Sequence, residues 1–116
     1  MFYVVSAIAL MIALLHLWIL VLEMFLWEQP RTREVFGTTP EFAKATKAMA
    51  ANQGLYNGFL AVGLLIGVIL GDRGFISFFL TCVAVAGIFG AATVSMRIFF
   101  VQALPALIGL LLLVLA

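Results

Sequence analysis

The sequence predicts an all-α membrane protein, built as a bundle of four transmembrane helices with an amphipathic cytoplasmic helix between the first and the second. Three observations lead to this prediction. Of the 116 residues, 66% are hydrophobic and only 9% are charged, whereas soluble domains have roughly 45–50% apolar and about 25% charged residues. The mean hydropathy is +1.30. The apolar residues are also gathered into four long runs, and a soluble fold of this length could not bury them all.

The four apolar runs cover residues 3–27, 52–71, 75–95 and 98–115. Each approaches the roughly 20 residues that a helix needs to cross a bilayer. Gly71-Asp72-Arg73-Gly74 separates the second run from the third as a tight turn, because its charged pair cannot lie in hydrocarbon. Met96-Arg97 divides the remaining apolar stretch, which is too long for one helix. We therefore interpret residues 1–116 as a single membrane domain.

Composition excludes several classes of protein. Six Lys and Arg residues against five Asp and Glu residues give a net charge of +1, so no basic face for nucleic acid is expected. Cys82 is the only cysteine, which excludes a disulfide scaffold. His16, Cys82 and Glu23 lie on different helices or at different depths and lack the spacing of metal ligands. We therefore expect no metal site and no cofactor.

The cations predict the orientation, because Lys and Arg flanking transmembrane helices are retained in the cytoplasm. One side carries five of them, and Arg73 alone marks the other; the five are Arg31, Arg33, Lys44, Lys47 and Arg97. We therefore expect the loop of residues 28–51 to be cytoplasmic and both chain ends to lie outside, as in a multi-pass membrane protein.

The loop contains a helix start at Thr39-Pro40-Glu41. Thr39 would cap the helix, Pro40 would take its first position, and Glu41 suits the positive end of the dipole. A second register makes Thr38 the cap, with Glu41 completing a capping box. The segment beyond Pro40 is predicted as an interfacial amphipathic helix or as a cytoplasmic extension of the second span.

Polar residues of the first span lie on one stripe with small residues, at spacings of three and four. The stripe contains Ser6, Ala9, Ala13, His16, Leu20, Glu23 and Trp27, and we expect it to face the bundle interior. His16 and Glu23 are about 10 Å apart along the helix axis, so they share a face but do not touch.

The second span opens with the run Asn52-Gln53-Gly54-Leu55-Tyr56-Asn57-Gly58. Gly54 and Gly58 form a G-x-x-x-G pair, which favours close helix packing, and the series Gly63, Gly67 and Gly71 could pack on a partner or on a second copy of the chain. In the fourth span, Pro105 predicts a kink just past Gln102.

These polar side chains are predicted to lie at similar depth and to form a pocket that opens toward the cytoplasm, with His16 at its floor. The candidate ligand-binding residues are His16, Glu23, Trp27, Asn52, Gln53, Tyr56, Asn57, Thr93, Arg97 and Gln102. The outer half of the bundle, by contrast, is almost entirely Gly, Ala, Leu, Val and Ile.

The order of these residues resembles a family of small bacterial membrane proteins, domain of unknown function 1304. The matching segments are His16, Leu22-Glu23-Met24-Phe25-Leu26-Trp27, Pro30-Arg31, Asn52 to Leu60, Gly90-Ala91-Ala92-Thr93 and Val101-Gln102-Ala103-Leu104-Pro105. The likeness covers essentially the whole chain without a departure in these segments. It implies a fold of four membrane helices and brings no established activity.

Each candidate residue also has a purely structural interpretation. Glu23 costs roughly 2.5–3.5 kcal/mol to place in a membrane, which makes it a functional candidate, yet it could simply pair with Arg97 or reach the interface. His16 could be hydrogen-bonded to a neighbouring helix. The amide run could serve as polar glue between helices, and Trp27 and Tyr56 could be interface anchors.

Three functions are compatible with this pattern. We favour a bundle that binds or transports a lipophilic or cationic amphiphilic small molecule, whose head group Glu23 and the amides would recognise. The second is a membrane-embedded enzyme that uses Glu23 and His16 for proton transfer on a lipid-soluble substrate. The third is a non-catalytic subunit that assembles with membrane partners or with itself through the glycines of the second span.

Overall fold

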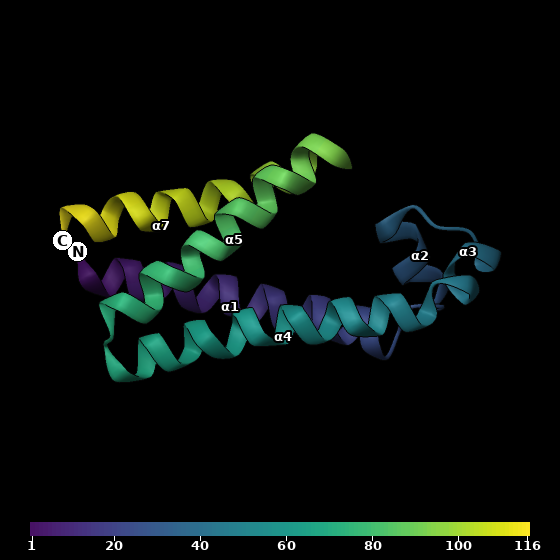
Figure 1. The fold of residues 1–116 in the computed structure, drawn as a ribbon, viewed down its shortest axis with the longest axis horizontal. Coiled ribbons are helices and arrows are strands. Elements are labelled where there is room, and N and C mark those ends of the chain that lie inside the picture. Colours follow the sequence, from purple (N-terminus) through teal and green to yellow (C-terminus); the bar gives the residue numbers. More distant parts are fainter. The chain divides into compact units, whose positions relative to one another are not determined.

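The computed structural model describes residues 1–116, which form helices joined by short turns and no strands (Figure 1). The elements in chain order are α1 (Phe2–Met24), α2 (Pro30–Phe36), α3 (Pro40–Ala45), α4 (Lys47–Leu70), α5 (Arg73–Thr93), α6 (Met96–Ile98), the π-helix η1 (Phe99–Ala103) and α7 (Leu104–Leu115). Four helical stretches are long and apolar enough to cross a membrane: Phe2–Met24, Lys47–Leu70, Arg73–Thr93 and Met96–Leu115. The predicted all-α class and the four long apolar helices are thus confirmed.

The chain divides into two compact units. The first contains residues 1–14 and 60–116, and the second contains residues 15–59. Because α1 and α4 are each continuous, both helices contribute one part to each unit. The single domain expected from the length stays a prediction.

The first unit packs through small residues. In α4, Gly63 lies against the ring of Phe79, and Gly67 lies against Ile76. In α5, Gly87 meets the backbone of Ala103 so closely that an added Cβ would come within 2.5 Å of the Ala103 nitrogen. Such close backbone approach is how helices associate where lipid removes the usual hydrophobic driving force. Gly63 and Gly67 of α4 therefore pack on α5 of the same chain, while association of two copies through this helix stays a prediction.

The two chain ends lie side by side in this unit (Figure 1). Arg73, at the start of α5, donates a hydrogen bond from Nη2 to the carbonyl oxygen of Leu113 over 2.7 Å. Its guanidinium also lies 5.6 Å from the centroid of the Phe2 ring. A cation at the last carbonyls of α7 is favourable because these carbonyls carry partial negative charge. Arg73 therefore joins the beginning of α1 to the end of α7.

The turn between α4 and α5 agrees with its prediction. Gly71 has φ 62°, a left-handed conformation that glycine adopts without a steric penalty. Asp72 then caps α5, since its Oδ1 accepts a hydrogen bond from the backbone N–H of Phe75 over 3.0 Å. The helix begins at Arg73, two residues earlier than the apolar run at 75 suggests.

The fourth span starts earlier than predicted and contains a π-helix just before Pro105, while the kink itself stays a prediction. It begins at Met96 rather than residue 98, because the Ser95 hydroxyl caps the backbone N–H of Arg97 over 3.2 Å. Where Pro105 predicts a kink, the structure has the π-helix η1, and the N–H of Leu104 bonds to the Phe99 carbonyl. A π-helical turn widens the helix just before a residue whose ring would clash with the preceding turn.

In the second unit, two helix boundaries were predicted wrongly. We expected the first span to reach residue 27, but α1 ends at Met24, where the N–H groups of Phe25 and Leu26 both turn back to the Val21 carbonyl. We expected the second span to begin at 52, but α4 begins at Lys47. Hydropathy locates the apolar part of a helix, whereas the Ala-rich stretch before Asn52 extends the helix itself.

The predicted loop of residues 28–51 contains two helices. The helix start at Thr39-Pro40-Glu41 is confirmed in its first register, because Thr39 Oγ1 accepts from the N–H of Phe42 over 3.1 Å. Helix α2 was missed. Its signals are present in the sequence, with Pro30 at the first helical position and Gly37, at φ 68°, terminating the helix.

We expect Gly87→Val to lower the free energy of unfolding by about 1–3 kcal/mol, because the new side chain must displace the backbone of Ala103. Ala92→Val is the matched control, since Ala92 is an exposed residue of the same helix. Thermal unfolding followed by circular dichroism would measure both. Equal stability of the two variants would contradict the close contact between α5 and η1.

Candidate functional site

The centre of the candidate site is a hydrogen bond between α1 and α4 inside the second unit. The side-chain amide of Asn57 donates from Nδ2 to Glu23 Oε1 over 2.6 Å. Both side chains are buried, with 7% of Glu23 and 8% of Asn57 exposed. A buried carboxyl oxygen and a buried amide each need a hydrogen-bond partner, and here they supply one to each other. Two of the ten candidate residues are thus joined directly.

Two glycines of α4 bring these side chains together. A Cβ added at Gly54 would lie 2.6 Å from Met24 Cγ, 3.2 Å from Glu23 Cβ and 3.3 Å from the Leu20 carbonyl oxygen. A Cβ added at Gly58 would lie 2.7 Å from Leu20 Cδ1. A larger residue at Gly54 would meet the Leu20 backbone and Glu23 Cβ and push α4 away from α1, whereas at Gly58 it would displace the end of the Leu20 side chain. The G-x-x-x-G pair found in the sequence is the surface on which the two helices meet.

Glu23 lies where a negative charge is unfavourable. It lies in the last turn of α1, where the unpaired backbone carbonyls carry partial negative charge. An anionic side chain gains nothing from that end of a helix and, when buried, needs a donor or a cation. The Asn57 amide supplies a donor without a compensating positive charge.

His16 lies two turns before Glu23 on the same helix. Only 1% of its surface is exposed, and the side chain takes part in an interaction within the protein. The seven-residue separation corresponds to about 10 Å along the axis, so the two groups are not in direct contact. The role of His16 as the floor of a pocket stays a prediction.

The residues of the amide run differ in their burial. Asn57, with Gly54 and Gly58, is buried against α1, whereas Asn52, Gln53 and Tyr56 are exposed. Asn52 donates to the Ala48 carbonyl of its own helix over 3.3 Å. The Tyr56 ring lies edge-on to Phe59, with 5.6 Å between centroids. Within this unit, only Asn57 among the four polar residues of the run contacts Glu23.

Trp27 has partners that the sequence did not indicate. Its indole Nε1 donates to Thr46 Oγ1 over 3.1 Å, and its ring centroid lies 5.0 Å from that of Phe36. Thr46 and Phe36 belong to the predicted loop of residues 28–51, and the pattern of apolar runs contains no signal that pairs them with Trp27. The nearest sequence signal is the Trp at the end of an apolar run, which predicts an interfacial anchor.

The three remaining candidates belong to the first unit. The Thr93 hydroxyl donates to the Phe89 carbonyl of its own helix over 2.7 Å. Arg97 is exposed and lies in the short helix α6. Gln102 is half-buried within η1. The shared depth of these residues with Glu23 stays a prediction.

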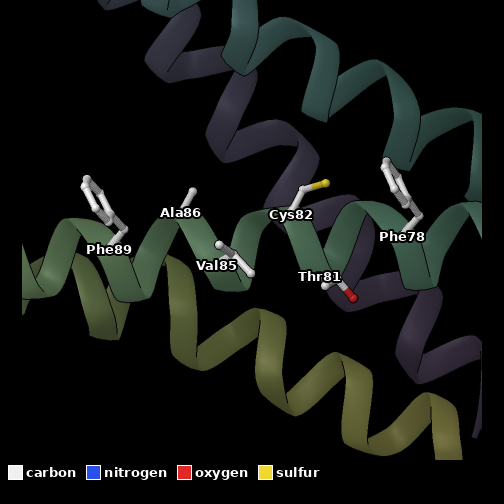
Figure 2. A pocket seen from close by; sticks show the side chains of 6 residues that line it. All are labelled: Phe78, Thr81, Cys82, Val85, Ala86 and Phe89. Carbon is white, nitrogen blue, oxygen red and sulfur yellow. The ribbon is translucent and has the colours of Figure 1, made fainter.

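A shallow pocket of about 510 Å³ lies along α5 (Figure 2). The side chains that line it follow the helical spacing of three and four: Phe78, Thr81, Cys82, Val85, Ala86 and Phe89. The rings of Phe78 and Phe89 stand at its two ends. The Thr81 hydroxyl donates to the Ser77 carbonyl of the same helix over 2.7 Å. The pocket contains none of the ten candidate residues and no charged side chain.

We expect Asn57→Ala to lower the free energy of unfolding by about 1–3 kcal/mol, since it leaves a buried carboxylate oxygen without its donor. Asn52→Ala is the matched control, because that exposed amide bonds only within α4. Chemical denaturation of the purified protein in detergent would measure the two. An effect of Asn52→Ala as large as that of Asn57→Ala would contradict the assignment.

Comparison with known proteins identifies one family. The family described as "Protein of unknown function (DUF1304)" matches residues 10–114, which include every candidate residue named above. Searches among curated proteins and among solved structures give no match. The match covers nearly the whole chain, as the residue pattern from His16 to Pro105 implied. The chain therefore belongs to the DUF1304 family.

Proposed function

We propose that this chain is a small integral membrane protein that binds a lipophilic cation or a cationic amphiphile, with Glu23 and Asn57 recognising the positively charged head group. The single observation that supports the proposal is the buried hydrogen bond between these two side chains. The apolar part of such a ligand would lie in the lipid beside the helices.

Glu23 is distinguished by its location. The protein has five acidic residues, and the other four, Glu28, Glu34, Glu41 and Asp72, lie outside the four long apolar helices. A carboxylate within such a helix is costly and is a functional candidate by default. Topology does not require a charge at this place, and packing alone would be served by an apolar residue.

The partner of Glu23 is the uncharged amide of Asn57, and this favours a cationic ligand over a neutral one. An amide neutralises no charge, so an anionic Glu23 keeps an attraction for positive charge after Asn57 is bonded to Oε1. Oε2 is the oxygen that a head group would approach. In a low-dielectric environment the attraction between unlike charges is much stronger than in water. A transporter version would add exchange of the cation against a proton on the same carboxylate.

The ligand proposal is tested by Glu23→Gln, which keeps the shape and the acceptor oxygen but removes the charge. Ethidium, a lipophilic cation, would be titrated against the protein in lipid nanodiscs at neutral pH and followed by fluorescence anisotropy. We expect the affinity to fall at least about tenfold, or about 1.4 kcal/mol. Glu28→Gln, which alters an exposed glutamate paired with Lys47, should bind as the unaltered protein does.

A neutral dye separates head-group recognition from general partitioning into lipid. Nile red should bind equally well to the unaltered protein and to Glu23→Gln. Equal ethidium affinity in the two proteins would refute the role of Glu23, and equal losses in Glu23→Gln and Glu28→Gln would reduce the effect to surface charge.

We also propose the orientation in which residues 28–51 face the cytoplasm and both ends of the chain face outside. Four apolar helices support a multi-pass protein, and the excess of Lys and Arg on one side supports this direction. The bacterial inner membrane is the expected location.

The orientation is tested with single cysteines in a Cys82→Ser background. Ala116→Cys should react with a membrane-impermeant maleimide in intact cells. Glu34→Cys, on exposed α2, should react only after the cells are permeabilised. The reverse pattern of labelling would show the opposite orientation.

A further inference from the structure

We propose that α3 and α4 are two parts of one hinged helix, which bends at Thr46 and is held in the bent form by a hydrogen bond from Trp27. This conformational device lies entirely within residues 15–59 and does not depend on the proposed ligand. It concerns Thr46, Trp27 and Phe42, of which only Trp27 belongs to the candidate site.

The break between the two helices is one residue long. α3 ends at Ala45 and α4 begins at Lys47, and Figure 1 shows α3 turning off the line of α4 at this point. Thr46 has φ −106° and ψ 11°, whereas an α-helical residue has about −63° and −42°. Regular backbone bonding continues on both sides, with Thr46 N–H bonded to the Phe42 carbonyl and Ala50 N–H bonded to the Thr46 carbonyl.

The local sequence contributes one weak cause of the break, the bond from the Thr46 hydroxyl to the Phe42 carbonyl of the preceding turn. The stretch Ala43-Lys44-Ala45-Thr46-Lys47-Ala48-Met49-Ala50-Ala51 contains neither proline nor glycine. Ala, Lys and Met are among the strongest helix formers, and Thr is only moderately unfavourable. A continuous helix would also pair the first N–H groups of α4, which have no partner within a helix that starts at Lys47. Local preference therefore favours a straight helix from Pro40 to Leu70.

Tertiary contacts supply the main cause, as a sharp helix bend requires. Thr46 Oγ1 accepts from Trp27 Nε1 over 3.1 Å, which is a contact between distant segments, while its own proton is donated locally to the Phe42 carbonyl over 2.7 Å. The Trp27 ring is held in turn against Phe36 of α2. The nearby ion pair between Lys47 and Glu28 is solvent-exposed, at 69% and 43%, and exposed pairs contribute little. The Trp27–Thr46 hydrogen bond is thus the main contact that holds the bend, and we call it the latch.

The latch joins the same two stretches of chain as the Glu23–Asn57 bond. Trp27 follows Glu23 by four residues, and Thr46 immediately precedes α4. Release of the latch would leave α1 and α4 joined at Gly54, Gly58 and Asn57, while α3 swings into line with α4. The bent and straight forms differ by a change at one residue, so a modest change in contacts shifts the balance between them.

The distance between spin labels on α3 and α4 distinguishes the two forms. Labels would be attached to the exposed positions Glu41→Cys and Leu55→Cys in a Cys82→Ser background, in the full chain in nanodiscs without ligand. A straight helix places these backbone positions about 21 Å apart, and the bent form places them closer. Double electron–electron resonance would measure the distribution.

Two variants remove the latch in different ways. Thr46→Val keeps the branched shape and loses the hydroxyl, and Trp27→Phe keeps a ring beside Phe36 and loses the N–H donor. We expect both to shift the main distance to the straight value, while Thr46→Ser, which retains a hydroxyl, keeps the shorter distance. The hinge is refuted if the unaltered chain already shows the straight distance, or if both variants keep the shorter distance with unchanged helix content.

Discussion

The close approach of α1 and α4 is the constraint on which the polar part of this protein depends. Gly54 and Gly58 have no side chains, so the α4 backbone lies directly against Leu20, Glu23 and Met24. Only at this separation can the short Asn57 side chain reach the Glu23 carboxylate at 2.6 Å. The buried carboxylate in turn needs that donor, because an unsatisfied charged group in a low-dielectric interior costs far more than the bond contributes. The close packing at the glycines and the Glu23–Asn57 hydrogen bond therefore depend on each other.

The same packing principle operates in the first unit with apolar partners. Gly63 and Gly67 accommodate Phe79 and Ile76, and Gly87 accommodates the backbone of Ala103. The buried residues there are apolar, and charge appears at the ends, where Arg73 bonds to the last turn of α7. In the second unit, buried polarity is used instead, as a carboxylate–amide pair. The first unit shows that helices of this kind pack without a buried acid. Packing therefore does not require Glu23, which makes Glu23 a functional candidate.

Much of the fold could be predicted from residue patterns. The four apolar runs, the turn at Gly71, the Thr39 cap and the G-x-x-x-G pair each depend on interactions within a few residues or on the length of a hydrophobic run, and each was found. The errors arose where distant contacts override local preference. Helix α1 stops at Met24 although the run stays apolar to Trp27, whose indole is bonded to Thr46. The sequence suggests one polar cluster in the amide run, but helical geometry turns Asn52 away from Asn57, and Gln53, one turn before Asn57, is exposed.

The sequence alone predicts the four long apolar helices, because charged residues make up only 9% of the chain and are gathered in loops and at helix ends. It also singled out Glu23, because a carboxylate in an apolar run is recognisable without coordinates. Only the tertiary structure decided its partner. Several amides stood at a plausible depth, and the choice of Asn57 followed from which face of α4 carries the glycines. A hydrogen bond depends on the direction of each side chain to within a fraction of a turn, and packing between helices sets that direction.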